Sequence, residues 1–286
     1  MGTVYLGRSC RTGEKVAIKR VIDKYANVPG IRARAHLEAS LLFRHQNLVE
    51  MIGICELNPH TGPIFIVSRL VQGITLDQHV EQHLRNRADA VKKICESVYP
   101  VFDALEYIHS KGIIHMDIKP SNIMIENGFN IRLMDLGIAY ASDVANLTSS
   151  GLIGTPKYAA PEQYIEPGQH SLPIDRTTDI YELGVTLYEL LTGFNPFESP
   201  TREETLRKQR TETLPSVQDV PEPVIDVLRK ATAKSQADRF HTAREFKQAL
   251  QQALQEPKNK SGGWKLPILI GVITGIILVI ALMFFL

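Results

Sequence analysis

Hydrophobic positions along the chain of 286 residues fall into runs of different length, and each length predicts a different element. Residues 65–73 form a short, mostly apolar run, which is typical of a buried strand. Residues 180–191 form a longer apolar run, and Gly193 follows it as a helix stop, so we expect a buried helix there.

A capping pattern marks a further helix near residue 250. Thr242 and Glu245 have capping-box spacing, in which the two side chains satisfy backbone N–H groups of the first turn. Beyond them, apolar residues recur every four positions on one face: Phe246, Leu250 and Leu254. This periodicity predicts an amphipathic helix that ends the folded domain.

The longest apolar run lies at residues 266–286, where 21 consecutive positions are uncharged and rich in Ile, Leu and Val. As a helix this segment would span about 30 Å, the thickness of the hydrocarbon core of a bilayer. The alternative, a buried core helix, is disfavoured because the run is long, uniformly apolar and terminal. We therefore expect a single transmembrane helix that anchors the chain at its C-terminal end.

Residues 257–265 are polar and contain proline, serine and glycine, which predicts a flexible juxtamembrane linker. Three lysines and a tryptophan flank the apolar run on this side: Lys258, Lys260, Lys265 and Trp264. The positive-inside rule then places the folded domain in the cytoplasm. Gly271 and Gly275 have G-x-x-x-G spacing, which would let two helices approach and form a homodimer, although glycine is common in membrane helices generally.

Composition excludes one class of partner. The 44% of hydrophobic residues is ample for a globular domain beside the membrane segment, and a net charge of +1 without a basic block argues against nucleic acid. Cys10, Cys55 and Cys95 show neither disulfide nor metal-ligand spacing, so we interpret them as packing residues in a reducing cytoplasm.

The candidate chemistry lies in the segment HMDIKPSN, residues 115–122, and in DLG, residues 135–137. Together they space two carboxylates, an ammonium and an amide as phosphoryl transfer from Mg-ATP requires. Asp117 can accept the proton of a substrate hydroxyl, and Lys119 can reach the transferred phosphate. Asn122 and Asp135 offer the hard oxygen ligands that Mg²⁺ prefers.

With these motifs the chain resembles the Ser/Thr protein kinase family over residues 1–256. The sequences of its motifs are closest to those of bacterial-type members. Further matching motifs are Val16-Ala17-Ile18-Lys19, Ala160-Pro161-Glu162, Asp179 and Asp238-Arg239-Phe240. The resemblance implies an α+β, two-lobed kinase-like fold. A small β-rich lobe would cover residues 1–67, a hinge 68–73 and a large helical lobe 74–256, followed by the transmembrane helix.

The resemblance also assigns roles in binding ATP. Lys19 would hold the nucleotide phosphates and pair with Glu38 on a helix of the small lobe. Backbone groups of Arg69 and Val71 would meet adenine, with Ser68 guarding the back pocket. Apolar side chains would sandwich the ring: Val4, Ala17 and Met124.

Structural and substrate roles follow from the same resemblance. Asp179 would hold the backbone of the segment 115–122, and Glu162 would pair with Arg239. Thr155 would hydrogen-bond near Asp117 and Lys119, a feature of the branch that phosphorylates Ser and Thr residues of proteins. This peptide-binding element disfavours a kinase for small molecules.

Two departures from the family pattern stand out. Only the last part of the glycine-rich loop G-x-G-x-x-G-x-V is present, with Gly2 at its third glycine, so we expect the natural start to lie upstream of Met1. The alternative is a small lobe without its edge strand and half of its phosphate lid.

Met116 replaces the arginine that receives a phosphorylated loop in many kinases. Residues 148–150 remain candidate phosphosites, or a polar loop without modification.

These departures keep a second class of function open, a membrane-anchored pseudokinase that acts as a scaffold with weak or no catalysis. Against it, the four residues that phosphoryl transfer needs are all intact: Lys19, Asp117, Asn122 and Asp135. We therefore expect an active, membrane-anchored Ser/Thr kinase with ATP and Mg²⁺ as cofactors, proteins as substrates, and a capacity for autophosphorylation in signalling.

Overall fold

The structure, a computed structural model, describes residues 2–21, 32, 35–36, 40, 43–56, 58, 61–135, 155–164 and 173–255. They all belong to the first of two compact units, Met1–Gln255, and the second is Glu256–Leu286. Glu38, the candidate phosphosites at 148–150, the linker 257–265 and the apolar run 266–286 lie outside the described residues. Among the described helices, none is both long and apolar enough to cross a membrane.

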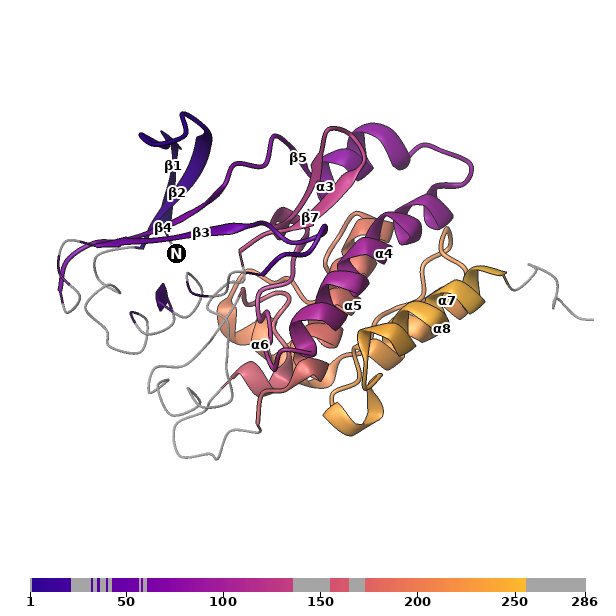
Figure 1. Cartoon of the computed structure of the whole chain (residues 1–286). Coiled ribbons are helices and arrows are strands. Elements are labelled where there is room, and N and C mark those ends of the chain that lie inside the picture. Colours follow the sequence, from indigo (N-terminus) through magenta and orange to yellow (C-terminus); the bar gives the residue numbers. More distant parts are fainter. Residues whose placement is uncertain are drawn as a thin grey trace, which may run out of the picture. The chain divides into compact units, whose positions relative to one another are not determined.

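The N-terminal part of the chain forms an antiparallel sheet of four strands in the order β1-β2-β4-β3 (Figure 1). The strands are β1 Gly2–Arg8, β2 Lys15–Val21, β3 Met51–Glu56 and β4 Ile64–Arg69. Met51, Ile64 and Ile66 from these strands form a small core together with Ala35, which lies outside the strands. The run predicted as a buried strand thus contains most of β4, and its last residues lead out of the sheet.

A second sheet of three short strands follows in the order β5-β6-β7. It comprises β5 Gly73–Thr75, β6 Ile123–Glu126 and β7 Asn130–Leu133. Gly73 must be a glycine, because a Cβ atom there would lie 1.9 Å from the carbonyl oxygen of Ile125. The N–H of Leu133 donates to the carbonyl of Asn47 at 2.8 Å, which ties this sheet to the segment leading into β3.

Helices dominate the remainder of the described chain. The longer ones are α4 Ala90–His109, α5 Arg176–Thr192, α6 Arg202–Thr211, α7 Glu222–Ala231 and α8 Ala243–Gln255. The short ones are α3 Leu76–His79, the π-helix η1 Val80–Leu84, and the 3₁₀ helices η2 Pro120–Asn122, η4 Pro161–Gln163 and η5 Gln236–Asp238. Helix α5 packs against α4 and α7, and α8 packs against the same two helices (Figure 1).

The predicted buried helix is confirmed as α5, which is apolar on nearly all sides and therefore lies in the large core. It begins before the apolar run, where the Asp175 side chain accepts the N–H of Thr177. It ends at Gly193, whose φ of +83° is the left-handed conformation of a helix C-cap. The capping pattern of α8 is also confirmed, since the N–H of Glu245 donates to Thr242 Oγ1 at 3.1 Å.

The large core joins α4, α5, α7 and α8 with the three-stranded sheet, while the four-stranded sheet has its own core. This separation confirms the predicted two-lobed α+β fold. The interpretation of the cysteines is correct only in part. Cys95 is buried on α4, but Cys10 in the β1–β2 turn and Cys55 on β3 are exposed.

Candidate active site

The segment 115–122 lies between α4 and β6 in the chain, and side chains of α5 bind its backbone. The Asp179 carboxylate accepts the N–H groups of His115 and Met116, both at 2.9 Å, as predicted. Met116 has a φ of +67°, a conformation that L-residues rarely adopt, and its side chain is fully buried beside Ile114 and Ile174. The two hydrogen bonds to Asp179 therefore stabilise a strained backbone one residue before Asp117.

Asp117, Lys119 and Thr155 form a closed triangle of hydrogen bonds. Lys119 Nζ lies 2.7 Å from Asp117 Oδ2, and Thr155 Oγ1 donates to Asp117 Oδ1 at 2.6 Å. Lys119 Nζ also donates to Thr155 Oγ1 at 2.7 Å. The sequence prediction that Thr155 contacts both residues is confirmed, and it places the segment 155–164 against the segment 115–122.

Asn122 also contacts the Asp117 carboxylate, at the same oxygen that Lys119 binds. Its amide nitrogen donates to the carbonyl of Asp117 at 2.8 Å and to Asp117 Oδ2 at 3.0 Å. Because the nitrogen is engaged with Asp117, the amide oxygen of Asn122 points to the opposite side. That oxygen is the atom a metal ion would bind.

The charge state of Asp117 follows from two opposing influences. Burial is the largest and raises the pKa of this carboxyl. The Lys119 ammonium and the hydrogen bonds from Lys119 and Thr155 together outweigh burial and hold the pKa of Asp117 below its usual value. Asp117 is therefore ionised at neutral pH and can accept a hydrogen bond from an incoming hydroxyl.

Lys19 on β2 reaches the same region, because its Nζ lies 3.3 Å from Asp135 Oδ1. The N–H of Met134 donates to the Asn122 carbonyl at 2.7 Å, so Asp135 follows directly on a residue bound to Asn122. Asp135 has a φ of +42° and a side chain that is 41% exposed. The predicted pairing of Lys19 with Glu38 stays a prediction, since Glu38 lies outside the described residues.

The oxygen donors of Asn122 and Asp135 fit a divalent metal that takes its other ligands from phosphates and water. Mg²⁺ binds in this way, through one or two carboxylates plus substrate oxygens, and not in a cage built only of protein. The described residues contain no group of three or more His, Cys, Asp and Glu side chains placed to hold a metal by themselves.

The residues predicted to surround adenine come from both sheets. Val4 pairs with Lys19 in the β1–β2 register, and Ala17 pairs with Ser68 in the β2–β4 register. Met124 lies on β6 of the other sheet, where it pairs with Thr75.

At the end of β4, the backbone is already partly engaged. The N–H of Arg69 donates to the Glu50 carbonyl at 2.9 Å, so that N–H is not available to a nucleotide. Val71 follows in the link to β5 and is buried.

Sequence reasoning missed Glu126, a buried carboxylate at the end of β6. Arg69 Nη2 and Arg132 Nε bind its Oε2 at 2.9 and 3.0 Å. The hydrogen bond from Arg69 is the largest influence on Glu126 and, with that from Arg132, lowers its pKa. The cluster joins the end of β4 to the three-stranded sheet, and no local sequence pattern marks it.

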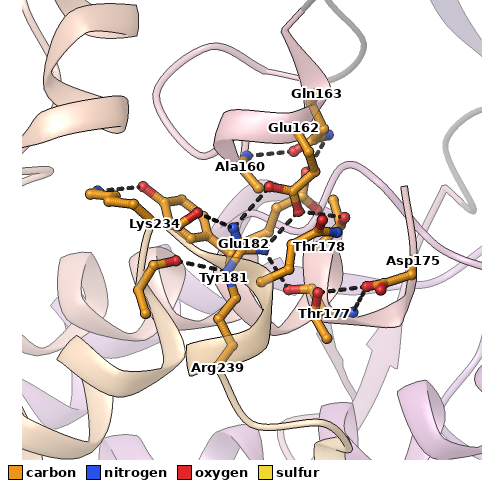
Figure 2. Close-up of polar contacts among 12 residues, drawn as sticks. Ala160, Glu162, Gln163, Asp175, Thr177, Thr178, Tyr181, Glu182, Lys234 and Arg239 are labelled. Atoms are coloured by element: carbon orange, nitrogen blue, oxygen red, sulfur yellow. Dashed lines mark hydrogen bonds and ion pairs between the residues drawn. The ribbon is translucent and has the colours of Figure 1, made fainter. Parts of the chain in front are cut away.

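Glu162, which belongs to the segment 155–164, forms the predicted ion pair with Arg239 (Figure 2). Both side chains are fully buried. Arg239 Nη1 and Nη2 contact the two carboxylate oxygens at 2.6 and 2.8 Å. Thr178 Oγ1 donates to Glu162 Oε1 at 2.7 Å, and Arg239 Nη1 donates to the Thr177 carbonyl at 3.0 Å. The pair fixes the end of this segment to α5.

A two-lobed fold with Asp117, Lys119, Asn122 and Asp135 gathered in this way defines a protein kinase. The chain belongs to the protein kinase family, because the family model described as "Protein kinase domain" matches residues 1–255. Membership implies the use of ATP and of a divalent metal ion.

Several bacterial Ser/Thr kinases are among its relatives. The chain is 32% identical over 254 residues to the "Probable serine/threonine-protein kinase PknB" of Lactococcus lactis, with 86% of this chain and 39% of the relative covered. It is 32% identical over 257 residues to PknB of Mycolicibacterium smegmatis, covering 86% and 40%. It is 31% identical over 253 residues to PrkC of Bacillus subtilis, covering 86% and 37%. The chain thus spans about two fifths of the length of these relatives.

Proposed function

We propose that the chain transfers the γ-phosphoryl group of ATP to Ser and Thr hydroxyls of proteins. The observation that carries this proposal is the triangle of Asp117, Lys119 and Thr155, in which an ionised, buried carboxylate lies beside a cation. Phosphoryl transfer needs a positioned nucleophile and neutralised charge more than it needs covalent chemistry. This arrangement supplies both.

Each residue then has a distinct role. Asp117 orients the attacking hydroxyl and accepts its hydrogen bond, while Lys119 stabilises charge on the transferred phosphoryl group. Lys19, paired with Glu38, aligns the nucleotide phosphates. Asn122 and Asp135 hold Mg²⁺, which neutralises phosphate charge when bound.

The adenine ring lies between the lobes in this proposal. The backbone carbonyl of Arg69 and the backbone of Val71 bind its edge, with Ser68 at the back of the pocket. Three apolar side chains cover its faces: Val4, Ala17 and Met124. The support is that Val4 and Ala17 lie in register with Lys19 and Ser68 on adjoining strands.

Radiolabel transfer from Mg-ATP tests the proposal with the full chain in detergent, extended upstream where the reading frame permits. The Asp117→Ala variant is the matched control, and mass spectrometry maps the products. Phosphoserine or phosphothreonine that depends on Asp117 supports an active kinase and shows whether residues 148–150 are autophosphorylated. Folded wild type that binds ATP but transfers nothing favours the pseudokinase scaffold.

We also propose that residues 266–286 anchor the kinase, with residues 1–256 as the kinase domain and 257–265 as the linker. The length and apolarity of the segment support this, and the flanking lysines place the kinase in the cytoplasm. Full-length chain should stay with membranes after alkaline extraction, whereas Ile273→Asp should release it. Release of the wild type would overturn the anchor.

Anchored helices would meet through Gly271 and Gly275 and bring two kinase domains together for signalling by autophosphorylation. Crosslinking of the full chain in membranes, compared with the Gly271→Ile variant, tests this pairing. Equal dimer yields from the two chains would exclude the proposed contact.

A further inference from the structure

Glu182 is a buried carboxyl on α5 that none of the steps above uses. It lies three residues after Asp179, and 1% of it is exposed. Its Oε2 accepts the N–H of Ile118 at 2.8 Å, the residue directly after Asp117. Its Oε1 accepts the side-chain amide of Gln163 at 2.9 Å (Figure 2).

Gln163 continues this contact into the segment that follows Thr155. Its Oε1 accepts the N–H of Ala160 at 2.5 Å, which fixes the orientation of the amide group because a backbone N–H can only donate. Its Nε2 donates both to Glu182 and to the carbonyl of Met116, the latter at 3.2 Å. A single side chain thus contacts three separate parts of the fold.

The backbone on both sides of Asp117 is held by these contacts. Gln163 binds the carbonyl before it, Glu182 binds the N–H after it, and Thr186 Oγ1 donates to the carbonyl of Ile118 at 3.0 Å. Asp117 itself contacts Thr155 directly. The segment 155–163 is therefore joined to the position of Asp117 twice, once through Thr155 and once through Gln163 and Glu182.

We propose that the Gln163–Glu182 bridge, meaning these two side chains and their hydrogen bonds, positions Asp117 for phosphoryl transfer and couples it to the segment 155–163. This inference rests on the proposed kinase function. The bridge touches backbone on both sides of the reacting carboxylate, so its loss displaces Asp117 without removing any group that binds ATP. Glu182 and Gln163 are positioning residues in this account, and they contact neither nucleotide nor metal.

Steady-state kinetics of the full chain in detergent test the bridge. We expect Glu182→Ala and Gln163→Ala each to lower kcat by about ten- to hundredfold, the range that small misplacement of a catalytic group produces, with the KM for ATP unchanged. Glu182→Gln keeps the side-chain volume and one acceptor, so its kcat should lie between those of wild type and Glu182→Ala. Tyr188→Phe is the matched control, because it removes a hydrogen bond from α5 to the Pro215 carbonyl, away from Asp117, and should leave kcat unchanged.

The double variant separates a bridge from two independent structural contributions. If Gln163 and Glu182 act together, Gln163→Ala with Glu182→Ala should have the kcat of the more impaired single variant. Three results would each overturn the proposal. In the first, the kcat losses of the two single variants multiply in the double variant. In the second, the KM for ATP rises in proportion to the loss of kcat; in the third, kcat is unchanged in folded Glu182→Gln and Gln163→Ala. Failure of the kinase function itself is distinguishable, since the wild type would then transfer no phosphate.

Discussion

Thr155 donates its hydroxyl hydrogen to Asp117 across 2.6 Å, although the two residues lie 38 positions apart in the chain. The same hydroxyl accepts a hydrogen bond from Lys119 at 2.7 Å. One threonine thus contacts both the carboxylate that orients the substrate hydroxyl in the proposed mechanism and the ammonium proposed to meet the phosphate.

Replacing Thr155 with valine should therefore lower kcat while leaving the KM for ATP nearly unchanged. A hydrogen bond to a charged group contributes about 1.5–3 kcal/mol, which corresponds to a loss of about ten- to hundredfold in rate. Steady-state kinetics of phosphate transfer provide the measurement. Thr155→Ser keeps the hydroxyl and should retain most of the activity; equal losses in both variants would show that the methyl group matters and not the hydrogen bond.

Removing Arg239 should destabilise the large lobe strongly. Arg239→Met leaves the Glu162 carboxylate buried without its main partner, and breaking such a pair costs about 3–5 kcal/mol of unfolding free energy. Urea denaturation of the full chain measures the loss. The double variant Glu162→Gln with Arg239→Met removes both charges and should recover part of it; a double variant as unstable as the sum of its parts would contradict the pairing.

The contact between Arg69 and Glu126 should affect nucleotide binding modestly. Arg69→Met frees the end of β4, and because the Arg69 side chain is 39% exposed its ion pair contributes only about 0.2–1 kcal/mol. We expect a rise of about 1.4- to fivefold in the KM for ATP, with kcat unchanged. Arg207→Met on α6 removes an exposed ion pair far from the hinge and serves as the control. If Arg69→Met and Arg207→Met have the same KM for ATP, the contact between Arg69 and Glu126 does not affect nucleotide binding.

Glu182 should make the stability of the protein depend on pH. Burial is the main cause that raises the pKa of Glu182 well above its ordinary value, and the negative charges of Asp179 and Asp117 raise it further. Hydrogen bonds from Ile118 and Gln163 lower the pKa but do not outweigh these influences. The folded chain therefore keeps this proton above the pH at which the unfolded chain loses it. Its contribution to stability is fully present below the unfolded pKa and is lost as pH rises toward the folded pKa.

Glu182→Gln removes this titration. From about pH 4.5 upward, the unfolding free energy of the variant relative to wild type should increase by up to about 1.4 kcal/mol per pH unit. Urea denaturation of both chains at several pH values between 5 and 7 measures the difference. A difference that does not change with pH would show that Glu182 has an ordinary pKa in the folded protein.

Motifs in the sequence predicted the parts of the site that depend on short spacing. Asp117, Lys119 and Asn122 lie within one segment, and the family pattern added Thr155 and the pairing of Glu162 with Arg239. All of the contacts predicted among them are present in the structure.

The contacts that sequence reasoning missed join residues without such a pattern. Glu182 is one of two charged residues in the apolar run 180–191, the other being Glu189, and a charge in such a run is a signal of a polar contact. Its partner Gln163 could not be predicted from spacing. Arg69 and Glu126 are 57 positions apart, and only the folded sheets bring them together. The positive φ of Met116 likewise results from the hydrogen bonds of Asp179 and not from a local preference of methionine.

The most direct test of the central claim is radiolabel transfer from Mg-ATP by the full chain, compared with its Asp117→Ala and Asp117→Asn variants. We expect phosphoserine or phosphothreonine from the wild type and a loss of transfer in both variants, which should still bind ATP. Transfer that persists undiminished in the folded Asp117 variants, or that is missing from folded wild type that binds ATP, would contradict it.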